Sequence, residues 1–234
     1  MSSSIIITGA SSGIGRAVSK RLAHWDGCLV LTGRSRQRLE EAKAQVEEHG
    51  GRAAVFPCDL TEPASVDDLV AYAETQDSVY GVIMSAGAGT YGKVEDQSAG
   101  EWSHVLEVNL LGPYHLARTA LPRMATREKG HFVFINSVAG FKTFPGNSAY
   151  VAAKHGLRGF AETLRLEARE YRIKVTSIFP GATNTEWWDK QEGDFPRKRM
   201  LDVDDVAAAV DFALNFSKKG VVEELVLRHR AGDF

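Results

Sequence analysis

The chain has 234 residues, of which 44% are hydrophobic, and its 28 basic residues against 30 acidic ones give a net charge of −2. This length and composition allow a large core, and a near-neutral charge without a basic stripe argues against a nucleic-acid-binding protein. No apolar run approaches the roughly 20 residues that cross a bilayer, and no targeting segment precedes the first apolar run, so we expect a soluble, cytoplasmic protein with no membrane partner. Two cysteines are too few for a disulfide scaffold or a cysteine metal site, and we expect no metal.

Short apolar runs alternate with longer helical patterns along the whole chain. Strands are predicted at residues 4–8, 28–33, 52–58, 81–85, 131–137, 174–179 and 224–228. Helices are predicted at residues 14–25, 36–49, 62–74, 101–127, 149–171 and 203–215. Most strand runs lack apolar–polar alternation, which is typical of strands covered on both faces. The pattern predicts an α/β fold with a doubly wound parallel sheet in three layers, forming a single domain over residues 1–234.

A glycine-rich loop follows the first predicted strand and opens the first predicted helix. Gly9 permits a tight turn, Gly13 lets the backbone approach a pyrophosphate, and Gly15 allows the helix to pack closely on the strand. The helix N-terminus adds free N–H groups and a partial positive charge. The loop therefore predicts a Rossmann-type dinucleotide site, with a simple glycine turn as the alternative. Its candidate contacts are Gly9, Ser11, Ser12, Gly13, Ile14 and Gly15.

Arginine follows the second predicted strand at the position where NAD-binding sites usually place an acidic residue. Arg34 can hold a 2′-phosphate through charge-assisted hydrogen bonds, and Ser35 lies beside it, so NADP(H) is the expected cofactor. The alternative is a solvated arginine in a loop. Asp59 and Leu60 close the third strand, where Asp59 is expected to face the adenine amino group; a turn or helix-cap carboxylate is the alternative.

Tyr150 and Lys154 are four residues apart, which places them on one face of a predicted helix. A phenol with a pKa near 10 is a poor proton donor and acceptor at neutral pH. A neighbouring ammonium stabilises the phenolate, so we expect Lys154 to lower the pKa of Tyr150 and to reach the nicotinamide ribose. An ordinary pair of helix residues is the alternative.

Two further polar residues lie where they can serve the same site. Ser137 ends the fifth predicted strand, and its hydroxyl is expected to face Tyr150 and to donate to a substrate carbonyl oxygen. Asn109 lies inside an apolar helical stretch, where asparagine is locally unfavourable. We therefore expect Asn109 to make a buried structural hydrogen bond or to hold a water for Lys154.

These motifs, in this order, resemble the short-chain dehydrogenase/reductase family. The loop from Thr8 to Gly15 is similar to the family's T-G-x-x-x-G-x-G motif, and the resemblance runs from about residue 5 to residue 206. It implies metal-free, reversible carbonyl reduction by a catalytic tetrad that matches Asn109, Ser137, Tyr150 and Lys154. It also implies cofactor contacts at Ala86, Gly87, Asn109, Tyr150, Lys154, Pro180, Gly181, Thr183 and Thr185.

The chain departs from the family pattern at two positions. Ser85 replaces an asparagine that braces the sheet in the family, and Ser12 occupies a position where many NADP-dependent members carry a basic residue. The resemblance implies a homodimer or a homotetramer packed through the two long helices around Asn109 and Tyr150. Because few residues follow the last predicted strand, a dimer is favoured over a tetramer.

Residues 183–202 lose helical and strand periodicity, and the resemblance identifies this region as the substrate lid. Trp187 and Trp188 are candidate substrate-binding residues, together with Ser137 and Tyr150. An equal alternative is that at least one of the two tryptophans only packs the lid onto the body. Further candidate wall residues are Phe141, Phe144 and the loop 90–94.

The sequence therefore predicts an oxidoreductase that transfers a hydride between NADP(H) and a small-molecule carbonyl or alcohol, such as a ketone, an aldehyde or a 3-oxoacyl compound. Two alternatives remain. One is a dinucleotide-sensing regulator of the same fold that lacks turnover, although such proteins typically lose the tyrosine or the lysine that this chain keeps. The other is the same chemistry with NAD(H).

Overall fold

Seven parallel strands form one sheet with helices on both faces. The computed structural model describes residues 2–191 and 194–232, so residues 192 and 193 of the expected lid lie outside the described residues. The strand order is β3-β2-β1-β4-β5-β6-β7, and every pairing is parallel. The strands are β1 (Ser3–Thr8), β2 (Cys28–Gly33), β3 (Arg52–Pro57), β4 (Ser78–Met84), β5 (Gly130–Ile135), β6 (Ile173–Pro180) and β7 (Glu224–Leu227).

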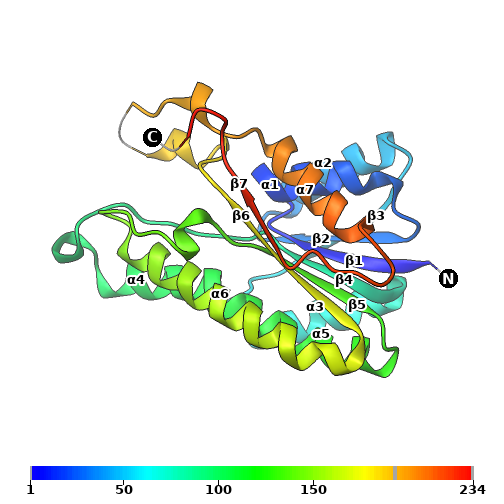
Figure 1. Cartoon of the computed structure of the whole chain (residues 1–234). Coiled ribbons are helices and arrows are strands. Elements are labelled where there is room, and N and C mark those ends of the chain that lie inside the picture. The colour runs from blue at the N-terminus through cyan, green and yellow to red at the C-terminus, as the bar shows by residue number, and fades with distance from the viewer. Residues whose placement is uncertain (1, 192–193, 233–234) are drawn as a thin grey trace.

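Two helical layers cover the sheet, as the predicted three-layer α/β fold requires. One layer holds α1 (Gly13–Arg21), α2 (Arg36–Glu48) and α7 (Val203–Asn215). The other holds α3 (Pro63–Gln76), α4 (Ala99–Leu106), α5 (Gly112–Thr126) and α6 (Ser148–Ala168). Figure 1 shows the first layer above the sheet and the second below it.

The alternation of side chains along the central strands explains the two cores. On β1, Ile6 packs into the cluster under α3, α5 and α6, whereas Ile5 and Ile7 pack into the cluster under α1, α2 and α7. All three are fully buried. Successive side chains of a strand point to opposite faces, so a strand covered on both faces is apolar at most of its positions. This constraint is the reason for the uninterrupted apolar runs.

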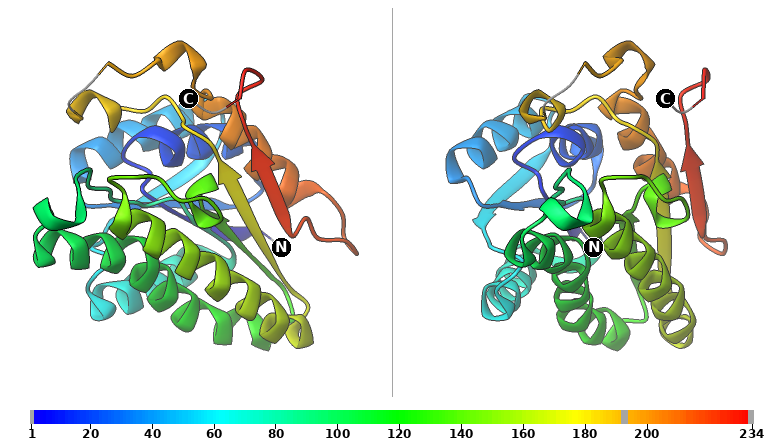
Figure 2. Two further views of the ribbon diagram at one scale, coloured as in Figure 1. Left: turned by 60° about the vertical axis from the view of Figure 1, so that its left-hand side comes forward. Right: turned by 90° about the vertical axis from the view of Figure 1, so that its left-hand side faces the viewer.

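The order of the strands reverses between β1 and β4. In a doubly wound sheet, ligands bind at the carboxyl ends of the strands near such a reversal. The loops that follow β1, β4, β5 and β6 all lie at this edge, and Figure 2 shows the segment after β6 rising above it.

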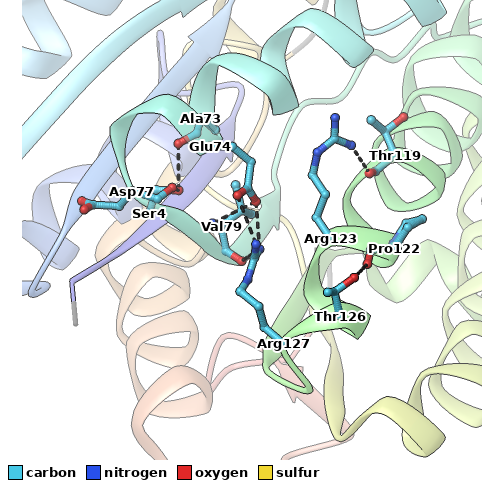
Figure 3. A network of polar contacts seen from close by, with 10 residues as sticks. All are labelled: Ser4, Ala73, Glu74, Asp77, Val79, Thr119, Pro122, Arg123, Thr126 and Arg127. Carbon is cyan, nitrogen blue, oxygen red and sulfur yellow. Dashed lines mark hydrogen bonds and ion pairs between the residues drawn. The ribbon is translucent and has the colours of Figure 1, made fainter.

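Exposed and half-buried polar contacts hold the opposite edge of the sheet. Arg127 donates to both carboxylate oxygens of Glu74, at 2.8 and 3.1 Å, and to the carbonyl of Val79 at 3.0 Å. Ser4 donates to the carbonyl of Asp77 at 3.1 Å. Bidentate arginine–carboxylate pairs combine charge with fixed geometry. This network, shown in Figure 3, fastens the ends of α3 and α5 to the start of β4, away from the carboxyl edge.

The predicted elements differ from the observed ones mainly around the fourth strand. β4 begins at Ser78 rather than Gly81, and the helix expected over 101–127 consists of α4 and α5 joined by a π-helical turn, Glu107–Leu111. Among the described residues, no helix is both long enough and apolar enough to cross a membrane.

A histidine is buried in β5. His131 is fully buried, and its Nε2 donates to the hydroxyl of Thr176 at 2.8 Å, because that hydroxyl itself donates to the carbonyl of Val222 at 2.6 Å. Its Nδ1 has no partner among the described residues. Burial, with a smaller contribution from Lys174, lowers the pKa of His131 to about 3.

We therefore expect His131 to make the fold sensitive to acid. The unfolded chain takes up a proton at this side chain near pH 6.5 and the folded protein only near pH 3, so stability falls as the pH drops through this window. Between pH 7 and pH 5 the loss from this group is about 2 kcal/mol. Urea unfolding at the two pH values should show that loss in the wild type and not in His131→Gln. His155→Gln, which removes an exposed histidine, is the control and should behave as the wild type. An identical pH dependence in His131→Gln would contradict the assignment.

Candidate active site

A cavity of about 550 Å³ opens at the carboxyl edge of the sheet, and it collects nearly all of the predicted site residues. Its lining includes Gly9, Ser11, Ser12, Gly13, Ile14, Gly15, Arg34, Asp59, Leu60, Ala86, Gly87, Asn109, Ser137, Tyr150, Lys154, Pro180, Gly181, Thr183, Thr185, Trp187 and Trp188. Ser35 is the exception: its hydroxyl accepts from the backbone N–H of Arg38 at 3.4 Å and caps α2 instead.

The loop before α1 has the shape that a pyrophosphate requires. Gly9 has a φ of +66°, and a Cβ there would lie 2.9 Å from Cα of Ala86. A Cβ on Gly15 would overlap the carbonyl oxygen of Gly9. The side chain of Ser12 makes no capping hydrogen bond, so the first N–H groups of α1 remain available to an anion. The loop therefore fits a dinucleotide phosphate.

Two side chains lie at the end of the cavity where the adenosine of a dinucleotide is expected. Arg34 follows β2 and Asp59 follows β3, the neighbouring strand, and both line the cavity. Asp59 Oδ1 accepts from the backbone N–H of Thr61 at 3.0 Å and from its hydroxyl at 2.8 Å, and these bonds lower the pKa of Asp59. Asp59 is thus a turn carboxylate that also faces the cavity.

The backbone after β4 is braced by a side chain from β1. Thr8 Oγ1 accepts from the backbone N–H groups of Ser85 and Ala86, both at 3.0 Å. The Ser85 hydroxyl itself has no partner among the described residues. The serine that replaces the family's asparagine therefore contributes no side-chain brace, and Thr8 joins the two strand ends.

Lys154 is the most deeply buried cation of the site. It is 3% exposed, and its Nζ donates to the carbonyl of Ile135, the last residue of β5, at 3.0 Å. The same Nζ lies 5.5 Å from the ring centre of Tyr150. Burial lowers the pKa of Lys154 to about 8 because desolvation disfavours the charged form.

Tyr150 differs from expectation in the direction of its pKa shift. Burial raises the pKa of Tyr150, and a hydrogen bond with Ser137 opposes part of that rise. The expected lowering by Lys154 was wrong, because its ammonium is directed at the carbonyl of Ile135 and desolvation of the phenol dominates. Tyr150 is therefore protonated at neutral pH, which is the form that donates a proton.

The hydroxyl of Ser137 is held in a defined position. Its Oγ accepts from the backbone N–H of Ala139 at 3.1 Å, where it caps a short 3₁₀ turn. An Oγ that accepts from a backbone group keeps its own proton for another acceptor. Ser137 therefore has a proton to donate toward the cavity and Tyr150.

Asn136 was missed by the sequence analysis. It is buried, its Oδ1 accepts from the backbone N–H of Ser137 at 2.8 Å, and its Nδ2 donates to the carbonyl of Lys154 at 3.3 Å. A Cβ on Gly140 would lie 2.8 Å from the same Oδ1. Asn136 thus joins the end of β5 to α6, a contact across 18 residues that local sequence patterns do not reveal.

Asn109 lies in the π-helical turn between α4 and α5. Its Nδ2 donates to the carbonyls of Ala88 at 2.7 Å and Val105 at 2.8 Å, which confirms the structural hydrogen bond offered as one alternative. Its Oδ1 is buried without a partner among the described residues. Pro113 has no N–H, so the backbone carbonyl of Asn109 also lacks its α-helical donor. π-turns of this kind are frequent at functional sites.

The segment after β6 crosses the cavity toward the cofactor loop. Thr185 Cγ2 would lie 3.3 Å from a Cβ on Gly13. Glu186 pairs with Arg38 of α2 at 3.1 Å. These contacts join the segment after β6, at one end of the site, to α2. This helix follows Arg34 at the other end of the site.

The two tryptophans both line the cavity and both pack against neighbouring residues. A Cβ on Gly89 would lie 3.2 Å from the Trp187 ring. Trp188 Nε1 donates to the carbonyl of Thr183 at 2.9 Å, and its ring lies 4.7 Å from that of Phe195. The two indoles meet edge to face at 4.8 Å.

The remaining wall differs in part from the predicted one. Phe144 lines the cavity, whereas Phe141 packs against Phe179 with tilted rings whose centres are 5.4 Å apart, and residues 90–94 lie outside the lining. Arg199 and His229, which the sequence analysis did not select, do line it.

Comparison with known proteins decides the family. The model of the family described as short chain dehydrogenase matches residues 3–194. The chain belongs to the short-chain dehydrogenase family. Sepiapterin reductase from Chlorobaculum tepidum is 31% identical to it, with 98% of this chain and 97% of the relative covered. An uncharacterized oxidoreductase from Staphylococcus epidermidis is 32% identical, with 95% of each covered.

Solved structures agree with this membership. An alcohol dehydrogenase from Thermococcus sibiricus, complexed with 5-hydroxy-NADP, has a TM-score of 0.89 at 30% identity, with 98% of this chain and 97% of that chain covered. A variant of actinorhodin polyketide ketoreductase with NADPH has a TM-score of 0.89 at 25% identity, with 100% and 98% covered. The short-chain dehydrogenase fold thus extends over the described chain.

We expect Asn136 to contribute measurably to stability. Asn136→Ala leaves the buried N–H of Ser137 without its partner and removes the side-chain bond to the carbonyl of Lys154, which should lower the free energy of unfolding by about 1–3 kcal/mol. Chemical denaturation measures the change. Asn215→Ala, which removes an exposed asparagine on α7, is the control and should cost less than about 0.5 kcal/mol. Equal stability of Asn136→Ala and wild type would show that Asn136 does not join β5 to α6.

Proposed function

We propose that this short-chain dehydrogenase is an NADP(H)-dependent oxidoreductase that interconverts a carbonyl and an alcohol. The observation that carries the proposal is the meeting of Ser137, Tyr150 and Lys154 in the cavity that also holds the glycine loop. A proton donor, a hydrogen-bond donor and a buried cation beside a dinucleotide site are the groups that carbonyl reduction needs. Ketones, aldehydes and 3-oxoacyl compounds are the candidate substrates.

The lining supports NADP(H) as the cofactor. Gly9 and Gly15 let the loop pack tightly against the backbone after β4 and against itself, so that the N-terminus of α1 faces the cavity, and Arg34 provides the charge for a 2′-phosphate at the end of β2. Three of the solved structures that resemble this chain contain NADP, NADPH or 5-hydroxy-NADP. When bound, the nicotinamide supplies or accepts the hydride.

The residues of the chain manage the proton and the charge at the carbonyl oxygen. Tyr150, protonated at neutral pH, donates its proton to that oxygen, and Ser137 donates a hydrogen bond to it. The ammonium of Lys154, 5.5 Å from the ring centre of Tyr150, favours the phenolate that Tyr150 becomes, but by less than the desolvation that raises the pKa of Tyr150. In the oxidation direction the same groups accept the proton from the alcohol.

We also propose that residues 183–202 cover the substrate and exclude water, because Trp187 and Trp188 line the cavity. Exposed apolar side chains on and beside α5 and α6 support assembly into a homodimer or homotetramer through these helices. These side chains are Leu111, directly before α5, Tyr114 on α5 and Leu166 on α6.

Tyr150→Phe tests the acid–base role. Removal of the phenolic hydroxyl should lower kcat for aldehyde reduction by about 10²- to 10⁴-fold, because proton transfer loses its donor. NADPH binding, followed by fluorescence, should stay within about twofold of the wild type, and Tyr171→Phe is the matched control at a tyrosine outside the cavity. Substantial remaining turnover in Tyr150→Phe would refute the assignment, whereas tight NADPH binding without turnover in the wild type would favour the sensing regulator.

Arg34→Asp tests the cofactor. It places a carboxylate where the 2′-phosphate is expected, so kcat/KM for NADPH should fall by about 10²-fold and that for NADH by much less. Arg36→Asp is the control, because Arg36 is exposed, pairs with Glu40 and lies outside the cavity lining. An equal fall for both cofactors, or a wild type that prefers NADH, would indicate NAD(H) instead.

A further inference from the structure

The loop before α4 lies against the turn before α6. The backbone N–H of Gly92 donates to the carbonyl of Gly146 at 2.9 Å, and a Cβ on Gly146 would lie 2.9 Å from Cε2 of Tyr91. Gly146 has a φ of +78°, a conformation that glycine adopts without strain. The helices α4 and α6 also pack side by side (Figure 1). Two segments that are far apart in the sequence are therefore in direct contact.

Gln97 joins these two segments by side-chain hydrogen bonds. Its Nε2 donates to the carbonyl of Gly92 at 2.8 Å and to that of Gly146 at 3.4 Å. Its Oε1 accepts from the hydroxyl of Ser148, the first residue of α6, at 2.9 Å. Two carbonyls on one side of the amide and a hydroxyl on the other fix its orientation, because a carbonyl can only accept. Gln97 is half-buried, so these bonds are partly shielded from water.

The turn that Gln97 holds forms part of the cavity wall. Phe144 and Asn147 line the cavity, and the backbone N–H of Asn147 donates to the carbonyl of Phe144 at 3.2 Å. Gly146 lies between them in the chain. Gln97 and residues 90–94 lie outside the lining. The loop that was expected to form the wall therefore supports the wall instead.

Core packing holds this turn only at its two ends. Phe141 packs against Phe179 of β6 before the turn, and Ala149 is fully buried after it. Residues 142–148 are all exposed or half-buried. A segment with few buried apolar contacts takes its position mainly from its hydrogen bonds. The contacts of Gln97 are therefore well placed to decide where the wall lies.

We propose that Gln97 is a positioning residue that sets the substrate specificity of the site. It holds residues 144–147 where the ring of Phe144 forms an apolar wall in the cavity that contains Tyr150. A carbonyl compound with an apolar group, such as a phenyl ring, can contact this wall, whereas a small aldehyde does not reach it. The proposal rests on the proposed function and adds to it a residue that contacts neither substrate nor cofactor.

Two aldehydes of similar reactivity, 3-phenylpropanal and propanal, test the proposal with NADPH. The ratio of their kcat/KM values measures the contribution of the phenyl ring and cancels the concentration of folded enzyme. We expect a ratio of about ten or more in the wild type, because the phenyl ring is buried against the wall. Gln97→Met keeps the length of the side chain and removes its hydrogen bonds. It should lower the ratio about fivefold through KM for 3-phenylpropanal and leave kcat for propanal within about twofold.

Ser148→Ala tests whether the effect passes through the contact with Gln97. It should lower the ratio about twofold, and the double variant should match Gln97→Met alone, because the Ser148 hydroxyl acts on the wall through Gln97. Gln45→Met is the matched control: Gln45 is a half-buried glutamine on α2, outside the cavity lining, and its replacement should not change the ratio. A ratio that Gln97→Met leaves unchanged, or effects of Gln97→Met and Ser148→Ala that multiply, would overturn the proposal.

A binding measurement separates this proposal from the proposed function. Calorimetry records the affinity of the NADP⁺-loaded protein for 3-phenylpropan-1-ol, which Gln97→Met should weaken about fivefold. If the wild type reduces neither aldehyde but Gln97→Met weakens this binding and Gln45→Met does not, the catalytic assignment fails and the role of Gln97 stands. If both aldehydes are reduced but Gln97→Met changes neither the ratio nor the affinity, the role of Gln97 fails and the catalytic assignment stands.

Discussion

The ammonium of Lys154 donates to the carbonyl of Ile135, and the site depends on this contact. It fixes α6 against the last residue of β5, and Asn136 reinforces the junction by bonding the carbonyl of Lys154. Because Tyr150 lies one turn before Lys154 and Ser137 lies two residues after Ile135, the same junction brings the phenol and the serine hydroxyl together. Lys154 is buried and its ammonium is bonded to a neutral carbonyl, so its pKa is lowered. Its protonation state is therefore sensitive to charged groups that come near it.

The sheet arranges everything else along one edge. Parallel strands deliver their carboxyl ends side by side, so the order β3-β2-β1-β4-β5-β6-β7 is also the order of chemical environments along the cavity. Arg34 after β2, the glycine loop after β1 and Ser137 after β5 follow one another along the cavity lining. The apolar strands pack against helices on both faces, and this packing holds their carboxyl ends in one sheet.

Local patterns predicted the parts of the site that are local. The glycine loop and the spacing of Tyr150 and Lys154 each lie within one turn or one loop, and the cavity contains both. Long-range contacts were not predictable in this way. The capping role of Ser35, the pairing of Glu186 with Arg38 and the pKa rise of Tyr150 depend on how distant segments pack and on how deeply they are buried.

The most direct test of this account is the titration of Lys154. Lysine labelled with ¹³C at Cε reports each ammonium separately by NMR, and Lys154→Met identifies the resonance. We predict one lysine that titrates near pH 8, well below the ordinary value of 10.5, because its side chain is buried against Ile135. If every lysine titrates near its ordinary value, Lys154 is solvated, the junction between β5 and α6 is absent, and the site described here does not form.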